Sequence, residues 1–386
     1  MKVLFVHNAY QHKGGEDSVL EAEGSLLSNR GHAVEYFTRQ NDEISQLSRV
    51  SVAMQTFWSS PVARDFEARL RSFKPDVVHV HNTFPRISPA VYWVAAKLGV
   101  PIVQTLHNFR LMCPQAMFLR EGKVCEDCLG KLPWRGALRG CYRDSRLQST
   151  VLASMVSLHR GLGTWQNKVT RYIALNEFCR NKFIEGGLPA ERILIKPNFV
   201  DFLPPIAVDR SDFLFVGRLS AEKGIDTLVA AASMVHSAKV HVAGSGPEAG
   251  LLDAASNINA LGARSHDEVR ALMCHAIALV MPSIWYETFG MVAIEAFAAG
   301  LPVIASRLGA LAVLIEDRVT GLLFEPGDPH SLAEAMRWAL EHPAEMAAMG
   351  MAARAKYEAN FTAEQNYRQL MTIYEGAIAE IKGSTS

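Results

Sequence analysis

Two glutamates, Glu287 and Glu295, flank a stretch of the chain whose residue types could bind an anion. The stretch follows an apolar run and predicts a loop that opens into a helix near Phe289. The first backbone N–H groups of that helix, at Phe289, Gly290 and Met291, would form an anion site. With a rise of about 1.5 Å per residue, Glu295 lies roughly 8 Å along the helix from Gly290. Carboxylates so placed could accept hydrogen bonds from hydroxyl groups on either side of a bound diphosphate.

This arrangement resembles the Glu-x7-Glu motif of retaining glycosyltransferases of family 4, which have the GT-B fold. The resemblance covers nearly the whole chain, because further landmarks of the family follow in order. It implies that Glu295 binds the ribose hydroxyls of a nucleotide donor and that Glu287 contacts the donor sugar. Taken alone, Glu287 could instead cap its helix, and Glu295 could be solvated.

Two cations, Arg218 and Lys223, occur in a glycine-bounded segment directly after the apolar run Phe213–Val216. The segment is similar to the family's Gly-Arg-Leu…Lys-Gly segment, whose two cations contact the donor diphosphate. A leaving nucleoside diphosphate gains negative charge in the transition state, and fixed cations stabilise that charge. Arg218 could bind it bidentately and Lys223 as a point charge, so catalysis would require no divalent metal.

Two pairs of glycines extend the resemblance. Gly244 and Gly246, at the end of the next predicted strand, resemble the family loop that lets the nucleotide approach the backbone closely. Gly14 and Gly15 follow the first strand and permit positive φ angles before a helix that begins near Glu16. In the family, a Gly-Gly loop here touches the donor phosphate and the acceptor, whereas a plain strand-to-helix turn is the alternative.

His107 stands at the end of another predicted strand, so we expect its side chain to face the same cleft. It matches the family's histidine near the transferred sugar, although a histidine at a strand end can also be structural. Retaining enzymes of this kind are thought to react on the front face of the donor, with the leaving phosphate helping to deprotonate the acceptor hydroxyl. We therefore assign positioning and polarisation to His107 and name no enzymic nucleophile.

Two further histidines, His79 and His81, lie on the preceding predicted strand. We expect them to alternate between opposite faces of that strand and therefore not to form a metal pair. His81 and Asn82 could reach the acceptor pocket.

Four cysteines lie in an insertion at 113–146. They could supply four thiolates to a structural zinc ion. The insertion contains one Cys-x2-Cys pair, and the four residues are Cys113, Cys125, Cys128 and Cys141. A reduced cysteine-bearing loop is the alternative, and a redox-active pair is disfavoured because the pair does not open a helix after a strand.

Short apolar runs alternate with helix-compatible stretches along the chain, which is typical of parallel sheets covered on both faces. They predict an α/β fold of two Rossmann-like, doubly wound domains that face each other across a cleft, as in GT-B. The predicted strands are Lys2–His7, Ala33–Thr38, Val77–His81, Ile102–Leu106, Tyr172–Asn176, Ile193–Pro197, Phe213–Val216, Lys239–Ala243, Ala276–Met281, Val303–Ser306 and Gly321–Phe324.

The domain boundaries follow from composition. We expect an acceptor-side domain over 1–197, a proline-rich hinge over 198–210 and a nucleotide-sugar-binding domain over 211–360. The C-terminal helix and tail, 361–386, are expected to cross back to the N-terminal domain.

The net charge of zero conceals a split between the halves of the chain. Residues 1–200 carry 26 Lys and Arg against 17 Asp and Glu, an excess of nine positive charges that residues 201–386 offset. The apolar stretch Val151–Leu158 is flanked by basic residues, namely Arg135, Arg139, Arg143, Arg146, Arg160 and Lys168. This pattern is typical of a helix resting on an anionic membrane surface, although a basic rim around a core helix explains it equally well. Nucleic acid is not expected as a partner, because no recognised binding module accompanies the patch.

With 49% hydrophobic residues, the chain can bury two cores, so disordered and fibrous classes are excluded. The N-terminus reads as a strand without a signal-peptide cleavage site, and we expect a cytoplasmic protein, peripheral on the inner face of the membrane if the basic patch binds lipid.

The function that these residues predict is a retaining, metal-independent glycosyltransferase. It would move a sugar from a nucleoside-diphosphate sugar to a hydroxyl of a saccharide or polyprenyl-linked acceptor, in polysaccharide or cell-envelope glycan biosynthesis. The alternatives are a GT-B nucleotide-sugar epimerase or phosphorylase and a non-enzymatic two-domain sugar-binding protein.

Overall fold

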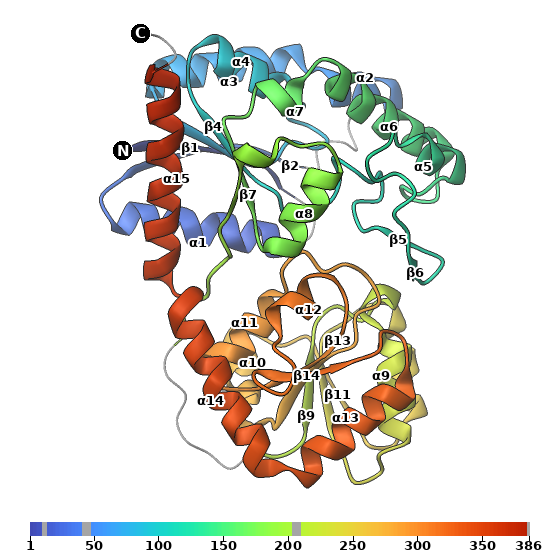
Figure 1. Cartoon of the computed structure of the whole chain (residues 1–386). Helices are drawn as coiled ribbons and strands as arrows, with labels where there is room; N and C mark the ends of the chain where they lie inside the picture. The colour runs from blue at the N-terminus through green and yellow to red at the C-terminus, as the bar shows by residue number, and fades with distance from the viewer. Residues whose placement is uncertain (10–13, 41–47, 203–209, 384–386) are drawn as a thin grey trace. The chain divides into compact units, whose positions relative to one another are not determined.

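The computed structural model describes residues 1–9, 14–40, 48–202 and 210–383, which form two compact units (Figure 1). Unit 1 comprises Met1–Ala116, Glu126–Lys196 and Asn366–Ser386, and unit 2 comprises Met117–Cys125 and Pro197–Gln365. Each unit is described by itself. The expected hinge at 198–210 falls in large part on residues 203–209, outside the described residues.

Unit 1 is built on a six-stranded parallel sheet with the strand order β2-β1-β3-β4-β7-β8. The central strands β1 and β3 are buried along nearly their whole length, as the apolar runs predict for a sheet covered on both faces. The strands are β1 (Lys2–Ala9), β2 (Ala33–Gln40), β3 (Val77–Asn82), β4 (Ile102–Thr105), β7 (Arg171–Ala174) and β8 (Ile193–Ile195).

The helices of unit 1 connect and cover these strands. They are α1 (Gly15–Asn29), α2 (Arg49–Phe57), α3 (Ser60–Phe73), α4 (Ala90–Lys97), α5 (Trp134–Arg139), α6 (Arg146–Gly161), α7 (Thr164–Asn167), α8 (Glu177–Glu185) and the C-terminal α15 (Ala363–Gly383). Leu370, Ile373 and Tyr374 of α15 lie in one buried cluster with Val3 and Phe5 of β1. The expectation that the C-terminal helix crosses back to the N-terminal domain is therefore confirmed.

Unit 2 contains a second six-stranded parallel sheet, with the order β11-β10-β9-β12-β13-β14. Its strands are β9 (Phe213–Val216), β10 (Val240–Ala243), β11 (Ile258–Gly262), β12 (Ala278–Met281), β13 (Val303–Ser306) and β14 (Gly321–Phe324). Its helices are α9 (Ile225–Ser233), α10 (His266–His275), α11 (Met291–Ala298), α12 (Gly309–Leu314), α13 (Pro329–Glu341) and α14 (Pro343–Asn360). A short antiparallel pair, β5 (Leu119–Arg120) and β6 (Lys123–Val124), belongs to the 117–125 segment.

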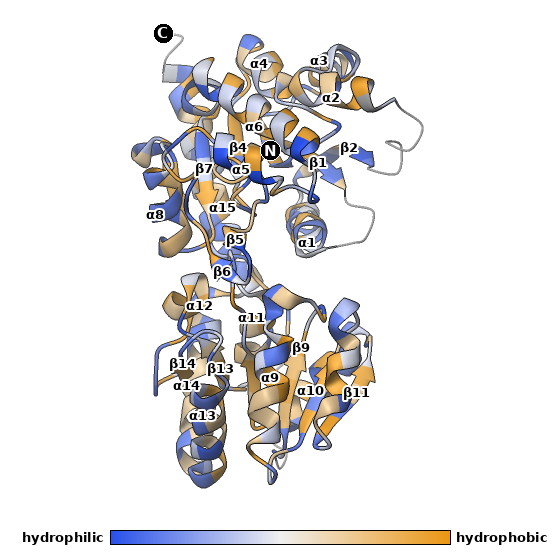
Figure 2. Cartoon of the chain, turned by 90° about the vertical axis from the view of Figure 1, so that its right-hand side faces the viewer, coloured by the Kyte–Doolittle hydropathy of each residue, from blue (hydrophilic) through white to orange (hydrophobic). Residues whose placement is uncertain are grey.

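The doubly wound α/β fold is confirmed, and three strands were missed, namely the edge strand β11 and the short pair β5 and β6. Figure 2 shows β9 in orange, because its residues are hydrophobic. Such apolar runs make a strand recognisable from the sequence. The edge strand β11 is partly or fully exposed at every position, so it has no apolar run. Among the described residues, no helix is both long and apolar enough to cross a bilayer.

The strand orders locate the ligand positions that this type of fold favours. Open α/β sheets bind ligands beyond the carboxyl ends of their strands, where the strand order reverses. In unit 1 this switch point lies between β1 and β3, and in unit 2 it lies between β9 and β12.

Candidate active site

Lys223 and Glu287 meet at the switch point of unit 2. Lys223 ends a 3₁₀ turn (Ala221–Lys223) shortly after β9, and Glu287 lies in the loop after the neighbouring strand β12. The Lys223 Nζ donates to Glu287 Oε1 at 2.6 Å. The Lys223 side chain is 25% exposed and that of Glu287 9%, so a ligand can reach this ion pair.

Glu287 is held by two further donors. Ser283 Oγ donates to its Oε1 at 2.8 Å and Trp285 Nε1 at 3.1 Å. The Lys223 ammonium also lies over the Trp285 ring, 5.5 Å from its centroid. Because three donors converge on one oxygen, the carboxylate is fixed in position and Oε2 remains for another partner. The interpretation of Glu287 as a plain helix cap is not supported, because its carboxylate binds these side chains instead.

Arg218 and the start of α11 provide further groups for an anion beside this pair. Arg218 is exposed, and no hydrogen bond or ion pair of its side chain is recorded among the described residues. The helix begins at Met291, two residues later than predicted, after Gly290 with φ of 91° as N-cap. The first N–H groups of a helix have no partner within it, so they are available to an anion.

Glu295 lies on α11, one turn beyond its start, and is partly buried. Burial raises the pKa of its carboxyl to about 7, and the charge of Arg270 opposes this rise only in part. A carboxyl group with such a pKa gains stabilisation from any ligand that donates hydrogen bonds to its ionised form.

The glycines after β10 have an internal reason to be glycines. A Cβ on Gly244 would lie 1.9 Å from the carbonyl oxygen of Gly217, and one on Gly246 would lie 2.2 Å from that of Leu219. Leu219 N also donates to Ser245 O at 2.9 Å. The loops after β9 and β10 therefore pack backbone against backbone, which places Arg218 and accounts for both glycines without a nucleotide.

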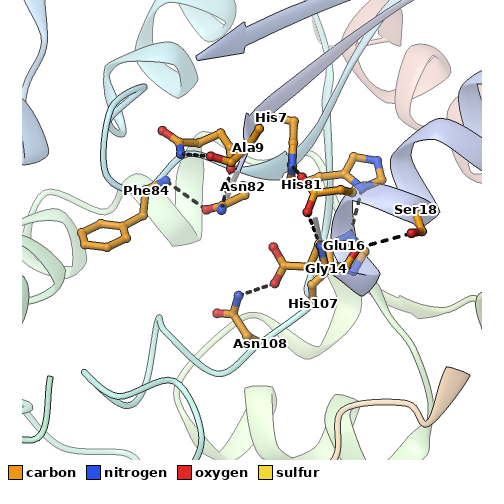
Figure 3. Close-up of polar contacts among 12 residues, drawn as sticks. His7, Ala9, Gly14, Glu16, Ser18, His81, Asn82, Phe84, His107 and Asn108 are labelled. Atoms are coloured by element: carbon orange, nitrogen blue, oxygen red, sulfur yellow. Dashed lines mark hydrogen bonds and ion pairs between the residues drawn. The ribbon is translucent and has the colours of Figure 1, made fainter. Parts of the chain in front are cut away.

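Gly14 and Gly15 behave differently. Neither has the positive φ that the sequence suggested, because Gly14 is extended with φ of −116° and Gly15 is the first residue of α1. The Gly14 N–H donates to Asp17 Oδ2 at 2.8 Å, and Asp17 Oδ1 contacts His7 Nε2 at 2.9 Å (Figure 3). A Cβ on Gly15 would meet no atom within 4 Å. Nothing within the described residues requires glycine at position 15, and the ligand contact that the family resemblance implies there stays a prediction.

His107 and His81 lie at the switch-point side of unit 1 and contact each other. His81 Nδ1 and His107 Nε2 are 2.9 Å apart, and the two rings are stacked (Figure 3). Burial is the main cause that lowers the pKa of His107 to about 3 and holds that of His81 well below its usual range. Both imidazoles are therefore neutral near pH 7, which suits polarisation by hydrogen bonding and not a fixed positive charge.

A small pocket in unit 1 adjoins these histidines. Its lining includes His81, Asn82 and His107 together with the aromatic side chains of Tyr92 and Trp165. The structure thus brings His81 and Asn82 to the pocket that His107 lines. Asn82 is held there because its Nδ2 donates to Asn8 O at 3.1 Å.

The expectation that His79 and His81 point to opposite faces is wrong. Residues two positions apart on a strand share a face, and the two ring centroids lie 4.4 Å apart. Both rings face Glu23 of α1, and the potential ligand atoms of these three buried residues lie within 4.8 Å of one another. Sequence reasoning missed Glu23, although it lies between Leu20 and Leu27 among the buried residues of α1.

Known proteins match the chain in both units. The family described as Glycosyl transferases group 1 matches residues 201–356, and the Glycosyl transferase 4-like domain matches residues 14–198. D-inositol 3-phosphate glycosyltransferase of Mycolicibacterium paratuberculosis is 31% identical over 318 residues, which cover 79% of this chain and 68% of that protein. The chain belongs to the group 1 glycosyltransferase family. The family assignment is consistent with the residues gathered at the unit 2 switch point.

Two further comparisons extend this family relationship. Glycogen synthase of Mycobacterium tuberculosis is 30% identical over 310 residues, which cover 75% of this chain, and the match spans 66% of that protein's length. The structure of Anabaena HepE in complex with UDP is 18% identical and covers 97% of this chain and 100% of its own, with a TM-score of 0.69. At this level of identity, the likeness to HepE shows that the two proteins share a fold.

The four cysteines of the insertion differ in burial. Cys113 and Cys128 are buried, whereas Cys125 and Cys141 are partly exposed. The zinc site that they suggest in this family member stays a prediction.

The basic residues around α6 divide into two groups. In the first group, the Arg160 guanidinium donates to the carbonyls of Lys131 and Leu111, and Arg135 and Arg139 pair with Asp127. In the second group, Arg143 and Arg146 are exposed.

Exposed apolar side chains also occur on α5, α6 and their flanks, namely Leu132, Trp134, Leu138, Leu147, Leu158 and Leu162. We call this set the α5–α6 face. A rim around a core helix does not explain so many exposed apolar side chains.

Proposed function

We propose that the chain is a retaining glycosyltransferase that moves a sugar from a nucleoside-diphosphate sugar to a hydroxyl of a saccharide or lipid-linked acceptor. Polysaccharide or cell-envelope glycan biosynthesis is the setting that we infer. The observation that carries the proposal is the ligand-accessible Lys223–Glu287 pair at the switch point of unit 2, with Arg218 exposed in the same loop after β9. Family membership supports it.

On the donor side, Arg218 and Lys223 hold the diphosphate, together with the N–H groups at the start of α11. These groups stabilise the negative charge that the leaving nucleoside diphosphate gains, which is the main demand of the reaction. Glu295 accepts hydrogen bonds from the ribose hydroxyls, and Glu287 orients the donor sugar through Oε2. Besides their packing against Gly217 and Leu219, Gly244 and Gly246 carry no side chains, so the nucleotide can lie close to the backbone there. No protein group in this scheme needs a divalent metal.

On the acceptor side, His107 and the pocket of unit 1 receive the sugar to be extended. The neutral imidazole of His107 polarises a hydroxyl, and Gly14 and Gly15 lie against the donor phosphate. The leaving phosphate takes the proton of the acceptor hydroxyl on the face from which it departs, so the configuration of the anomeric carbon is retained without an enzymic nucleophile.

The test is a donor screen with the purified chain. UDP-glucose comes first, because UDP is the ligand in the HepE complex, followed by other UDP-, GDP- and ADP-sugars with and without acceptor glycans. We expect nucleoside diphosphate release and a product with the anomeric configuration of the donor, which NMR reads directly. An inverted product would overturn the retaining mechanism. Interconversion of donor sugars without acceptor would indicate an epimerase, and binding without turnover a sugar-binding protein.

We further propose that the α5–α6 face rests on an anionic lipid surface. Exposed apolar side chains enter the headgroup region, while Arg143 and Arg146, both exposed, lie among the anionic headgroups. Flotation with vesicles that contain phosphatidylglycerol should recover the protein, and vesicles of phosphatidylcholine alone should not. Leu138→Glu with Leu147→Glu should abolish flotation, whereas Met351→Glu, at an exposed apolar position of unit 2, should not. Equal flotation of both variants would refute the surface.

We also propose that Cys113, Cys125, Cys128 and Cys141 bind one structural zinc ion. Elemental analysis of protein purified without chelator should give one zinc per chain, and Cys128→Ser should lose it. A metal-free, fully folded protein would leave the reduced loop as the correct interpretation.

A further inference from the structure

A buried ion pair lies beneath the histidines of unit 1. Lys196, directly after β8, donates from Nζ to Glu23 Oε1 at 2.6 Å, and both side chains are fully buried. An apolar pair of the same volume is often no less stable than a buried ion pair, so stability alone does not explain these two charges. Glu23 Oε2 has no hydrogen-bond partner among the described residues.

Two imidazoles face that free carboxylate oxygen. Nε2 of His81 lies 3.7 Å from Glu23 Oε2 and Nδ1 of His79 lies 3.8 Å from it. His79 uses both ring nitrogens elsewhere, because Nδ1 contacts Tyr374 OH at 2.7 Å and Nε2 contacts Thr105 Oγ1 at 2.8 Å. His81 Nε2, in contrast, is buried and has no hydrogen-bond partner among the residues described.

The cluster does not suit a metal ion, although its ligand atoms lie close together. Only Glu23 Oε2 and His81 Nε2 remain available, which is fewer than the three protein ligands that zinc sites use. The ammonium of Lys196 sits on the same carboxylate and would repel a cation. The remaining interaction of Glu23 is electrostatic, between its carboxylate and the Nε2 edge of His81.

That interaction decides where the proton of neutral His81 lies. A carboxylate 3.7 Å away favours an N–H at Nε2 over a lone pair there, so Nδ1 of His81 carries the lone pair. Nδ1 must then accept the hydrogen bond that joins it to His107, and His107 Nε2 must donate it. Nδ1 of His107 consequently carries a lone pair, and no partner for it is recorded among the described residues. The opposite tautomers would set a lone pair of His81 against the carboxylate.

We propose that Glu23 and His81 are positioning residues that fix His107 as the tautomer protonated on Nε2, so that its Nδ1 accepts a hydrogen bond from a sugar hydroxyl in the site. The assignment of sugar as the ligand rests on the proposed function, whereas the tautomer does not. Besides Glu23 and Lys196, the titratable groups around the two rings are His7, Asp17, His79 and Tyr374.

The direct test is ¹⁵N–¹H NMR of histidine-labelled protein near pH 7, with His107 assigned by its absence in His107→Gln. We expect Nε2 of His107 to be protonated and Nδ1 not. Glu23→Gln keeps the shape of the side chain, but its amide donates to His81 Nε2, so both tautomers should reverse. Wild-type His107 protonated on Nδ1, or a Glu23→Gln spectrum identical to wild type, would overturn the proposal. The wild-type spectrum decides even if Glu23→Gln does not fold.

A kinetic test uses the transfer reaction and a matched control. His81→Asn keeps a polar atom near Nδ1 but cannot reach Glu23, and it should lower kcat by roughly 10- to 100-fold with the donor KM nearly unchanged, the range that hydrogen-bond partners of functional histidines show in metal sites. His79→Gln alters the same cluster without contacting His107 and should retain kcat. Equal losses of kcat in both variants would mean that only the packing of the cluster matters, and would overturn the proposal. If the wild-type chain transfers no sugar, the proposed function fails, and the NMR test still decides the tautomer.

Discussion

Unit 1 and unit 2 each contain a lysine–glutamate ion pair with an N···O distance of 2.6 Å, and the two pairs differ in what surrounds them. Lys196 and Glu23 are fully buried in unit 1, whereas the Lys223 and Glu287 side chains in unit 2 are 25% and 9% exposed. The buried pair can act only on its neighbours within the fold. In the accessible pair, a ligand can bind the two side chains and replace part of their interaction with each other. Burial, and not the contact distance, therefore separates a positioning role from a binding role.

Removing one partner of the buried pair should have the largest effect on stability. Lys196→Met leaves a carboxylate buried without its cation, which should lower the free energy of unfolding by about 3–5 kcal/mol. Lys223→Met, in the accessible pair, should cost less, because Ser283 and Trp285 still donate to Glu287 and the Lys223 side chain is partly exposed. Urea denaturation measures both. Similar losses in the two variants would remove the distinction between the pairs.

The accessible pair should matter most for catalysis. Glu287→Gln keeps the hydrogen bonds of Ser283 and Trp285 but removes the charge, and it should lower kcat/KM by roughly 10²- to 10³-fold, as the loss of a preorganised polar group does. Glu222→Gln is the matched control, because that carboxylate accepts from Ser220 Oγ at 2.6 Å and pairs with no cation in the part of the chain that the structure describes. Full activity of Glu287→Gln would remove the pair from the site.

The two glycine pairs extend the comparison to the backbone. Gly246→Ala should lower the free energy of unfolding by about 1–3 kcal/mol, because its Cβ would overlap the carbonyl oxygen of Leu219. Gly15→Ala has open space and should not destabilise the protein, yet it should weaken binding of UDP-sugars if the donor phosphate lies against this loop. Calorimetric titration and thermal unfolding of both variants provide the check. Unchanged donor affinity in Gly15→Ala would show that no ligand approaches there.

The titration of Glu295 should give the smallest effect. Its pKa of about 7 means that the carboxyl is mostly protonated at pH 6 and mostly ionised at pH 8. Ribose hydroxyls donate to the ionised form, so UDP affinity should rise by up to about tenfold between these pH values. In Glu295→Gln, the change of UDP affinity with pH that Glu295 causes should disappear, and only the change caused by the titration of UDP itself should remain. A wild-type profile that matches Glu295→Gln would contradict the ribose assignment.

The sequence allowed most of the sheet to be predicted because its strands are apolar runs, and the exposed β11 shows where that signal ends. The unit 2 groups were recognisable because Glu287 and Glu295 stand in one short segment, as do Arg218 and Lys223 in another. The ion pair of unit 1 could not be recognised in this way. Glu23 and Lys196 are 173 positions apart in sequence, and only the packing of α1 and β8 on one sheet brings them together. His79 and His81 were placed on opposite faces although the two-residue period of a strand requires one face.

The C-terminal helix α15 sets an order for the synthesis of this chain. Leu370, Ile373 and Tyr374 complete a core that begins with Val3 and Phe5, so β1 leaves the ribosome long before the helix that packs against it. Residues 210–360 contain all the strands and helices of the second sheet, so they can fold while the ribosome is still adding α15. The half of the protein that is made first is therefore finished last, and until then it depends on keeping an incomplete apolar surface from aggregating.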